Sequence, residues 1–145
     1  CGVVDEQVLN QISEYDHLKS RINYKGYLSH DEIIKDYEKS ALLLLLLNDS
    51  DIANGHLPGK LFEYLKCRKP VLALGLEKSD VSEILVATQC GRVCGFDDSL
   101  TIKNEILNAF YNWGGQKREL NNEEILKYSR KDLSKVLAKT LDNLL

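Results

Sequence analysis

The residues ALLLLLL at positions 41–47, followed by NDSDIANG at positions 48–55, decide the fold class of this chain. An apolar run without alternation is typical of a strand that is covered on both faces, as in the middle of a parallel sheet. The alternative for such a run is a buried helix, but seven residues are too few for one. The polar residues that follow form a loop at the carboxyl end of the strand, where open α/β sheets bind their ligands.

Helices and an extended segment are predicted upstream of this central strand. Apolar residues recur at helical spacing over residues 6–15, and Ile22 to Leu28 has the extended character of a strand. A second helix is expected to run from Ser29 to about Ser40. Glu32 stands three residues after Ser29, which is the spacing of a capping box at a helix start.

Downstream of the central strand the same alternation continues. We expect a helix that starts at Pro58 and ends near Cys67, a strand over 70–75, a helix over 79–87 and a strand over 91–95. A helix over 99–113 follows, ended by Gly114 and Gly115. The tail over 122–145 is expected to be helical, broken near Ser129, and to pack back on the domain. This order predicts right-handed βαβ units. The fold class is therefore α/β, a Rossmann-like, doubly wound parallel sheet with C-terminal helices.

Length and composition limit the functional classes. A chain of 145 residues with 43% hydrophobic content suits a single domain, residues 1–145. The net charge is −3 and no basic block occurs, so we expect no nucleic-acid partner. The longest apolar run is far shorter than the roughly 18 residues of a membrane span. The chain contains no Met, even at position 1, and we interpret it as an excised fragment.

The cysteines favour a reducing compartment. Cys90 and Cys94 are spaced CxxxC with no His nearby, which is not a familiar zinc or redox spacing. We therefore expect all four cysteines to be reduced thiols and the protein to be cytoplasmic. The alternative is that Cys1 begins a processed lipoprotein, but no flexible Ser/Gly tether follows it.

The segment LPGKLFEYLKCRKPVL, from Leu57 to Leu72, resembles the donor-site signature of group 1 (family 4-like) glycosyltransferases. That signature consists of a loop, a helix carrying a Glu, a small-residue turn and a Pro-Val strand. The sequence YKGYL at 24–28, followed by a Ser-His-Asp-Glu helix start, resembles the upstream family pattern, and order and spacing agree across nearly the whole chain. The resemblance implies the C-terminal, nucleotide-sugar-binding half of a two-domain GT-B fold.

The predicted donor site has a physical basis apart from the family name. A helix N-terminus offers unpaired N–H groups and about half a positive charge, so the turn containing Gly55 and His56 can receive a diphosphate. Gly59 allows close backbone approach, and Lys60 adds a positive charge. Glu63, one turn into the helix, can accept hydrogen bonds from the vicinal hydroxyls of a ribose, and the resemblance assigns it that role.

In the same family the loop after the Gly26 strand holds the base through backbone groups. The resemblance therefore places Tyr27 and Leu28 beside the nucleobase, where Tyr27 could stack. The alternatives are ordinary surface roles: a solvent-facing carboxylate for Glu63, a surface lysine for Lys60 and a non-catalytic loop histidine for His56.

Two departures from the family pattern affect the catalytic inference. Relatives often have a second Glu eight residues before Glu63, but Gly55 stands there, so an acidic contact to the sugar is missing or supplied differently. The Arg and Lys that many relatives place on preceding elements would lie before Cys1. The N-terminal acceptor domain and the first elements of this domain are thus expected to be absent, no catalytic residue is assigned, and the fragment alone is expected to be inactive.

The implied activity is retaining transfer of a hexosyl group from a nucleotide-diphosphate sugar to an acceptor hydroxyl, in bacterial surface-polysaccharide synthesis. No cofactor or metal is expected, since the donor is a substrate and Asp49 and Asp51 are simply loop carboxylates. Membrane contact at the inner membrane, if any, would come through the missing half. Two alternatives are a GT-B-type sugar-nucleotide epimerase, against which KLFEYL argues, and a flavodoxin-like receiver or ligand-binding module. A receiver would need an acidic cluster after its first strand and a late Lys, which we do not find.

Overall fold

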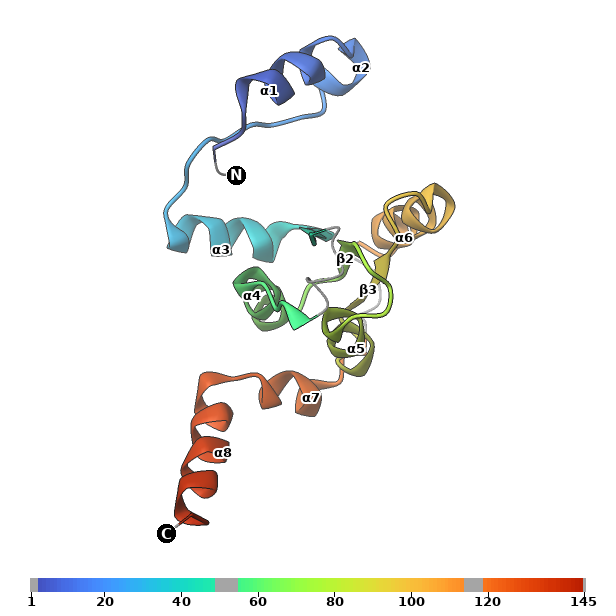
Figure 1. Cartoon of the computed structure of the whole chain (residues 1–145). Helices are drawn as coiled ribbons and strands as arrows, with labels where there is room; N and C mark the ends of the chain where they lie inside the picture. Colours follow the sequence, from blue (N-terminus) through green and yellow to red (C-terminus); the bar gives the residue numbers. More distant parts are fainter. Residues whose placement is uncertain (1–2, 49–54, 114–118, 145) are drawn as a thin grey trace. The chain divides into compact units, whose positions relative to one another are not determined.

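The structure, a computed structural model, describes residues 3–48, 55–113 and 119–144. The chain divides into two compact units, Cys1–Asp36 and Tyr37–Leu145, which are described separately (Figure 1).

The first unit is helical. It contains α1 (Glu6–Ser13), α2 (Asp16–Lys19) and most of α3 (His30–Lys39), whose last residues belong to the second unit. Asp5 caps α1, because its carboxylate accepts a hydrogen bond from the Gln7 N–H at 2.8 Å. At the start of α3, the Glu32 carboxylate accepts from the Ser29 N–H at 2.9 Å and from the Ser29 hydroxyl at 2.6 Å. The predicted capping interaction between Ser29 and Glu32 is therefore confirmed.

The strand predicted over residues 22–28 is wrong. The segment is irregular and belongs to no sheet. Gly26 has φ +64°, a left-handed conformation that interrupts an extended run. Lys25 instead forms an ion pair with Asp36 at 2.6 Å, so the polar side chains of this segment make local contacts in place of a strand ladder.

The second unit is built on a three-stranded parallel sheet. Its strands are β1 (Leu43–Leu46), β2 (Val71–Leu74) and β3 (Gly91–Cys94), in the order β1-β2-β3. Helix α4 (Gly59–Cys67) connects β1 to β2, and α5 (Asp80–Ala87) connects β2 to β3. The α/β class and the parallel strand direction agree with the prediction from sequence.

The position predicted for the leucine strand is wrong in the described sheet. The central strand is β2, and β1 lies at the edge. Leu43 and Leu45 are buried, whereas Leu44 and Leu46 are 52% and 65% exposed, so only one face of β1 is covered. A run of identical apolar residues favours a strand. Because the residues do not alternate in polarity, the run does not show which face of the strand is buried.

Helices lie on both faces of the sheet. Helix α4 contacts β1 and α5 contacts β3 (Figure 1), and both helices contribute buried residues to the core. Arg92 is in register with Leu72 and Leu44, so its side chain lies on the face opposite to the buried Leu43 and Leu45. It forms an ion pair with Glu105 of α6 (Ser99–Tyr111) at 3.5 Å. Helix α6 thus lies beside β3 on this face, while Leu44 and Leu46 of β1 stay exposed.

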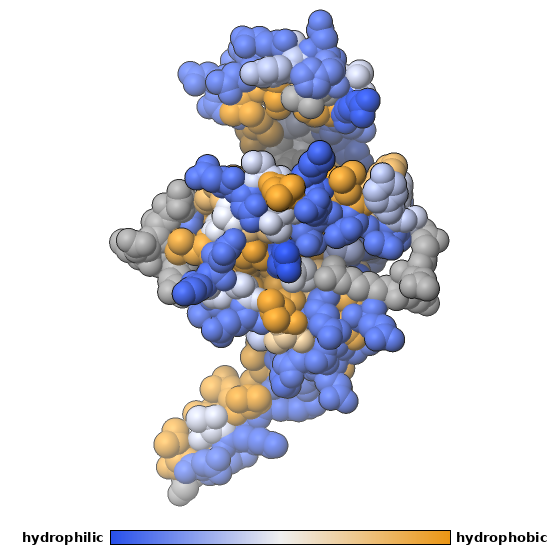
Figure 2. All heavy atoms as spheres, turned by 90° about the vertical axis from the view of Figure 1, so that its right-hand side faces the viewer, coloured by the Kyte–Doolittle hydropathy of each residue, from blue (hydrophilic) through white to orange (hydrophobic). Residues whose placement is uncertain are grey.

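The tail forms α7 (Asn122–Lys127) and α8 (Arg130–Asp142), with Ser129 as the N-cap of α8, which confirms the predicted break. Helix α7 docks on the core: Ile125 is buried, and the Asn121 N–H donates to the Thr88 carbonyl at 3.1 Å. Helix α8 has no buried residue, and its apolar side chains lie on the surface (Figure 2). The prediction that the tail packs back therefore holds for α7 but, among the described residues, is wrong for α8.

Cys67, Cys90 and Cys94 are free thiols, as expected, while Cys1 lies outside the described residues. Cys90 and Cys94 are buried, and burial raises the pKa of the Cys94 thiol. No helix in the described part of the chain is long and apolar enough to cross a bilayer.

Candidate functional site

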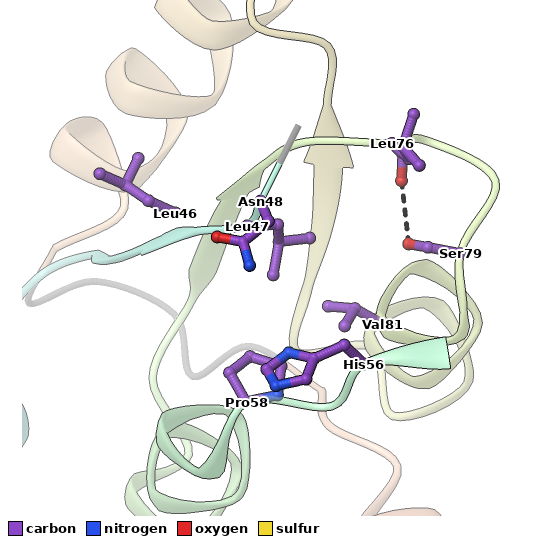
Figure 3. Close-up of a pocket in the computed structure, with 8 residues that line it drawn as sticks. All are labelled: Leu46, Leu47, Asn48, His56, Pro58, Leu76, Ser79 and Val81. Carbon is purple, nitrogen blue, oxygen red and sulfur yellow. Dashed lines mark hydrogen bonds between the residues drawn. The ribbon is translucent and has the colours of Figure 1, made fainter. Parts of the chain in front are cut away.

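A pocket of about 170 Å³ lies where the carboxyl ends of β1 and β2 meet the first turns of α4 and α5 (Figure 3). Its lining residues are Leu46, Leu47, Asn48, His56, Pro58, Leu76, Ser79 and Val81. This is the place at which open parallel sheets usually bind ligands. The prediction of a site after the leucine strand therefore coincides with a real concavity.

The close approach of two strand ends forms the inner wall of the pocket. The Leu47 N–H donates to the Leu74 carbonyl at 2.9 Å, which extends the ladder beyond β1. A Cβ built on Gly75 would lie only 2.7 Å from the Leu47 Cβ. Glycine at position 75 therefore lets the chain leave β2 against Leu47, and a side chain there would displace this wall.

The two helices at the rim begin differently. Ser79 caps α5: its hydroxyl accepts from the Ser82 N–H at 3.3 Å and donates to the Leu76 carbonyl at 2.9 Å. Pro58 is the N-cap of α4, and no side chain caps that helix. Among the described residues, no side chain accepts from the first N–H groups of α4, and these groups carry the partial positive charge of a helix N-terminus.

The pocket offers two polar side chains that remain accessible. Asn48 and His56 are exposed, and Figure 3 shows both lying between the strand ends and the helix starts. Ser79 is already occupied by its own helix cap. Among the described residues, the lining contains no carboxylate, and its polar side chains can donate and accept hydrogen bonds.

The predicted phosphate-binding residues lie at or beside this rim. His56 lines the pocket, whereas Gly55, Gly59 and Lys60 are exposed residues outside its lining. A Cβ built on Gly55 or Gly59 would meet no atom within 4 Å. No atom of the described residues therefore requires glycine at either position, and the close approach of a ligand to Gly59 stays a prediction.

Glu63 is half-buried on α4 and does not line the pocket. It lies four residues beyond Gly59, which places its Cα about 6 Å farther along the helix axis. Burial is the main cause that raises the pKa of Tyr37, Tyr64 and Cys67, and the charge of Glu63 adds to this effect in all three. Glu63 thus lies beside these groups, and no hydrogen bond or ion pair joins it to another described residue.

Two parts of the predicted site cannot be placed beside the pocket. Tyr27 and Leu28 belong to the first unit, where Tyr27 is exposed and Leu28 is half-buried, and their contact with a base stays a prediction. Asp49 and Asp51 lie outside the described residues, as does the rest of 49–54.

Several lining residues were missed from the sequence. Ser79, Leu76 and Val81 come from the segment between β2 and α5. The signal was present, because the predicted helix over 79–87 also follows the carboxyl end of a parallel strand. Parallel strands end at one edge of a sheet, so neighbouring strand–helix turns contribute to one site.

Among the described residues, no three His, Cys, Asp or Glu side chains gather as a metal site would require. No known family model matches the sequence, and neither a curated protein nor a solved structure shows significant similarity to it.

Proposed function

We propose that this chain is the donor-binding, C-terminal domain of a GT-B-type glycosyltransferase of group 1. It would bind a nucleotide-diphosphate sugar for retaining transfer of a hexosyl group to an acceptor hydroxyl. In a two-domain enzyme of this type, an N-terminal domain would bind the acceptor.

The observation that carries this proposal is that Glu63 has no hydrogen-bond or ion-pair partner among the described residues. Glu63 is half-buried, on a helix whose start lies at the pocket rim. A carboxylate without a protein partner retains its full capacity to accept hydrogen bonds from a ligand. Vicinal hydroxyls of a ribose would supply two donors.

The order of elements supports the same reading of the Leu57–Leu72 segment. Helix α4 carries Glu63, Arg68 ends it in a left-handed conformation with φ 54°, and β2 begins at Val71 after Pro70. A helix, a tight turn and a Pro-Val strand follow one another in the resembled signature as well.

In this proposal the N-terminus of α4 and Lys60 receive the diphosphate, and the pocket receives the sugar. Charge that develops on the leaving diphosphate would be stabilised by the free N–H groups of α4 and by the lysine ammonium. A retaining transfer of this kind requires no protein nucleophile. Asn48 and His56 would orient the sugar hydroxyls.

Calorimetric titration of the chain with UDP, GDP, ADP, dTDP and the matching monophosphates tests the proposal. We expect one base to be preferred and its diphosphate to bind more tightly than its monophosphate. Lys60→Ala should reduce this preference for the diphosphate, whereas Lys103→Ala, a matched change on the exposed surface of α6, should not. Absence of binding to every nucleoside diphosphate at millimolar concentration would contradict the proposal.

A further inference from the structure

The inner wall of the pocket depends on one glycine. Gly75 follows β2 directly, and Leu47 follows β1 directly. A Cβ built on Gly75 would lie 2.7 Å from the Leu47 Cβ, 3.1 Å from its Cδ1 and 3.3 Å from its Cγ. Carbon atoms that are not bonded prefer separations of about 3.5–4.0 Å. A side chain at position 75 would therefore force Leu47 to move.

A new rotamer of Leu47 cannot relieve this contact. Its Cβ is fixed by the backbone, and the backbone is held on β2 because the Leu47 N–H donates to the Leu74 carbonyl at 2.9 Å. Gly75 is held in turn by β3, since its N–H donates to the Cys94 carbonyl at 3.0 Å. Gly75 also has φ +156°, a conformation that other residues rarely adopt. A substitution at position 75 thus shifts the strand end itself.

That strand end carries lining residues of the pocket. Leu47 and Asn48 line it on one side, and Leu76, the residue after Gly75, lines it on the other. Figure 3 shows these three side chains on the segments that leave β1 and β2. A shift of Leu47 against Gly75 therefore changes the shape of the pocket at its inner wall.

The size and lining of the pocket suit one part of a donor molecule. Its volume is about 170 Å³, whereas pockets that enclose a whole drug-sized ligand measure roughly 300–1,000 Å³. Leucine and valine side chains form much of the described lining, and Asn48 and His56 add exposed polar groups. A sugar ring likewise combines apolar C–H faces with hydroxyl groups.

Resting on the proposed function, we propose that Gly75 is a specificity-determining residue that keeps the pocket open for the hexosyl group of the donor. The N-terminus of α4 lies at the rim, so the diphosphate contacts do not depend on the wall between Leu47 and Gly75. A side chain at position 75 would hinder entry of the sugar and leave the diphosphate site in place. Gly75 thus affects binding of the nucleotide sugar and not of the free nucleoside diphosphate.

Calorimetry with matched ligands tests this inference. The probes are UDP-glucose, GDP-mannose, ADP-glucose and dTDP-glucose beside the four free diphosphates, and the base that the native chain prefers supplies the pair. In Gly75→Ala we expect affinity for the nucleotide sugar to fall about fivefold or more, while affinity for the diphosphate changes less than about twofold. Gly95→Ala, the matched change at the same end of β3, should alter neither affinity, because a Cβ there meets no atom within 4 Å.

The outcomes separate the inference from the function on which it rests. Failure of the native chain to bind any nucleoside diphosphate overturns both. A native chain that binds a diphosphate but none of the four nucleotide sugars overturns only the role of Gly75, as does an equal loss, or no loss, of both ligands in Gly75→Ala. Should that variant fail to fold, as judged by circular dichroism, Leu47→Ala takes its place. It removes most of the wall, and an unchanged ratio of the two affinities would overturn the inference.

Discussion

Gly91, the first residue of β3, lies directly against the backbone of Val71 in β2. A Cβ built on Gly91 would be 1.9 Å from the Val71 carbonyl oxygen, far inside any possible contact. The absence of a side chain at position 91 therefore allows β3 to pair with the central strand where the ladder begins.

Gly91→Ala should destabilise the domain by about 1–3 kcal/mol, because the added methyl group must push β3 away from β2. Urea unfolding followed by circular dichroism measures this change. Gly59→Ala is the matched control, since a Cβ there meets no atom within 4 Å, and its stability should change by less than about 0.5 kcal/mol. Equal stability of Gly91→Ala and the native chain would show that the strands are not this close.

Arg68 ends α4 in the left-handed conformation, with φ 54° and ψ 38°. Non-glycine residues pay for this conformation, whereas glycine adopts it readily. Arg68→Gly should therefore raise the free energy of unfolding by about 0.5–1 kcal/mol, read from the urea midpoint. Arg68→Ala should give no such gain, and a gain of equal size in both variants would point to loss of the charge instead of relief of the backbone.

The pKa of Tyr37, raised to about 12 chiefly by burial, predicts loss of stability in alkali. In the unfolded chain this phenol titrates at about its ordinary value of 10. Between these values the unfolded chain binds fewer protons than the folded one, so stability falls as pH rises from about 10 to 12. Unfolding at pH 9 and 11 should show a smaller loss for Tyr37→Phe than for the native chain. An equal loss in both would mean that Tyr37 titrates normally.

The two tail helices should respond differently to truncation. Ile125 of α7 is buried, so Ile125→Ala should cost about 2 kcal/mol or more of unfolding free energy. Leu137 of α8 is 60% exposed, and Leu137→Ala should change stability by less than about 0.5 kcal/mol. Thermal unfolding of both variants checks this, and a large cost at Leu137 would mean that α8 packs on the core.

The fold class could be predicted because local signals agree with the tertiary structure. The apolar run ending at Leu47 and the Pro70–Gly75 segment both form neighbouring parallel strands, and Ser79 and Ser129 both act as N-caps. The place of β1 in the sheet could not be predicted, because six leucines satisfy a central and an edge strand equally well. The prediction for the segment around Gly26 was wrong for a related reason. An extended segment forms a β-strand only when it pairs with another strand, and the sequence does not show whether a partner exists.

The location of the pocket, though not all of its lining, could be predicted from the sequence. The strand-end loop led to His56 and the start of α4, since a helix N-terminus is visible in the sequence. The contribution of Ser79 depends on the alignment of neighbouring strand ends, and the contact of Tyr37 with Tyr64 depends on tertiary packing within the second unit. Neither relationship has a periodicity that a single sequence reveals.

The most direct test of a donor-binding domain is the affinity of Glu63→Gln for the preferred nucleoside diphosphate, measured by calorimetry beside Glu123→Gln. Glu123 is an exposed residue in the first turn of α7, so the control makes the same chemical change on another helix. A charge-assisted hydrogen bond contributes roughly 1.5–3 kcal/mol, and loss of one or two predicts binding weaker by about tenfold to several hundredfold in Glu63→Gln alone. Thermal stability should change little. Equal affinity of Glu63→Gln and the native chain would contradict the ribose-binding role and, with it, the main support for a nucleotide-sugar site.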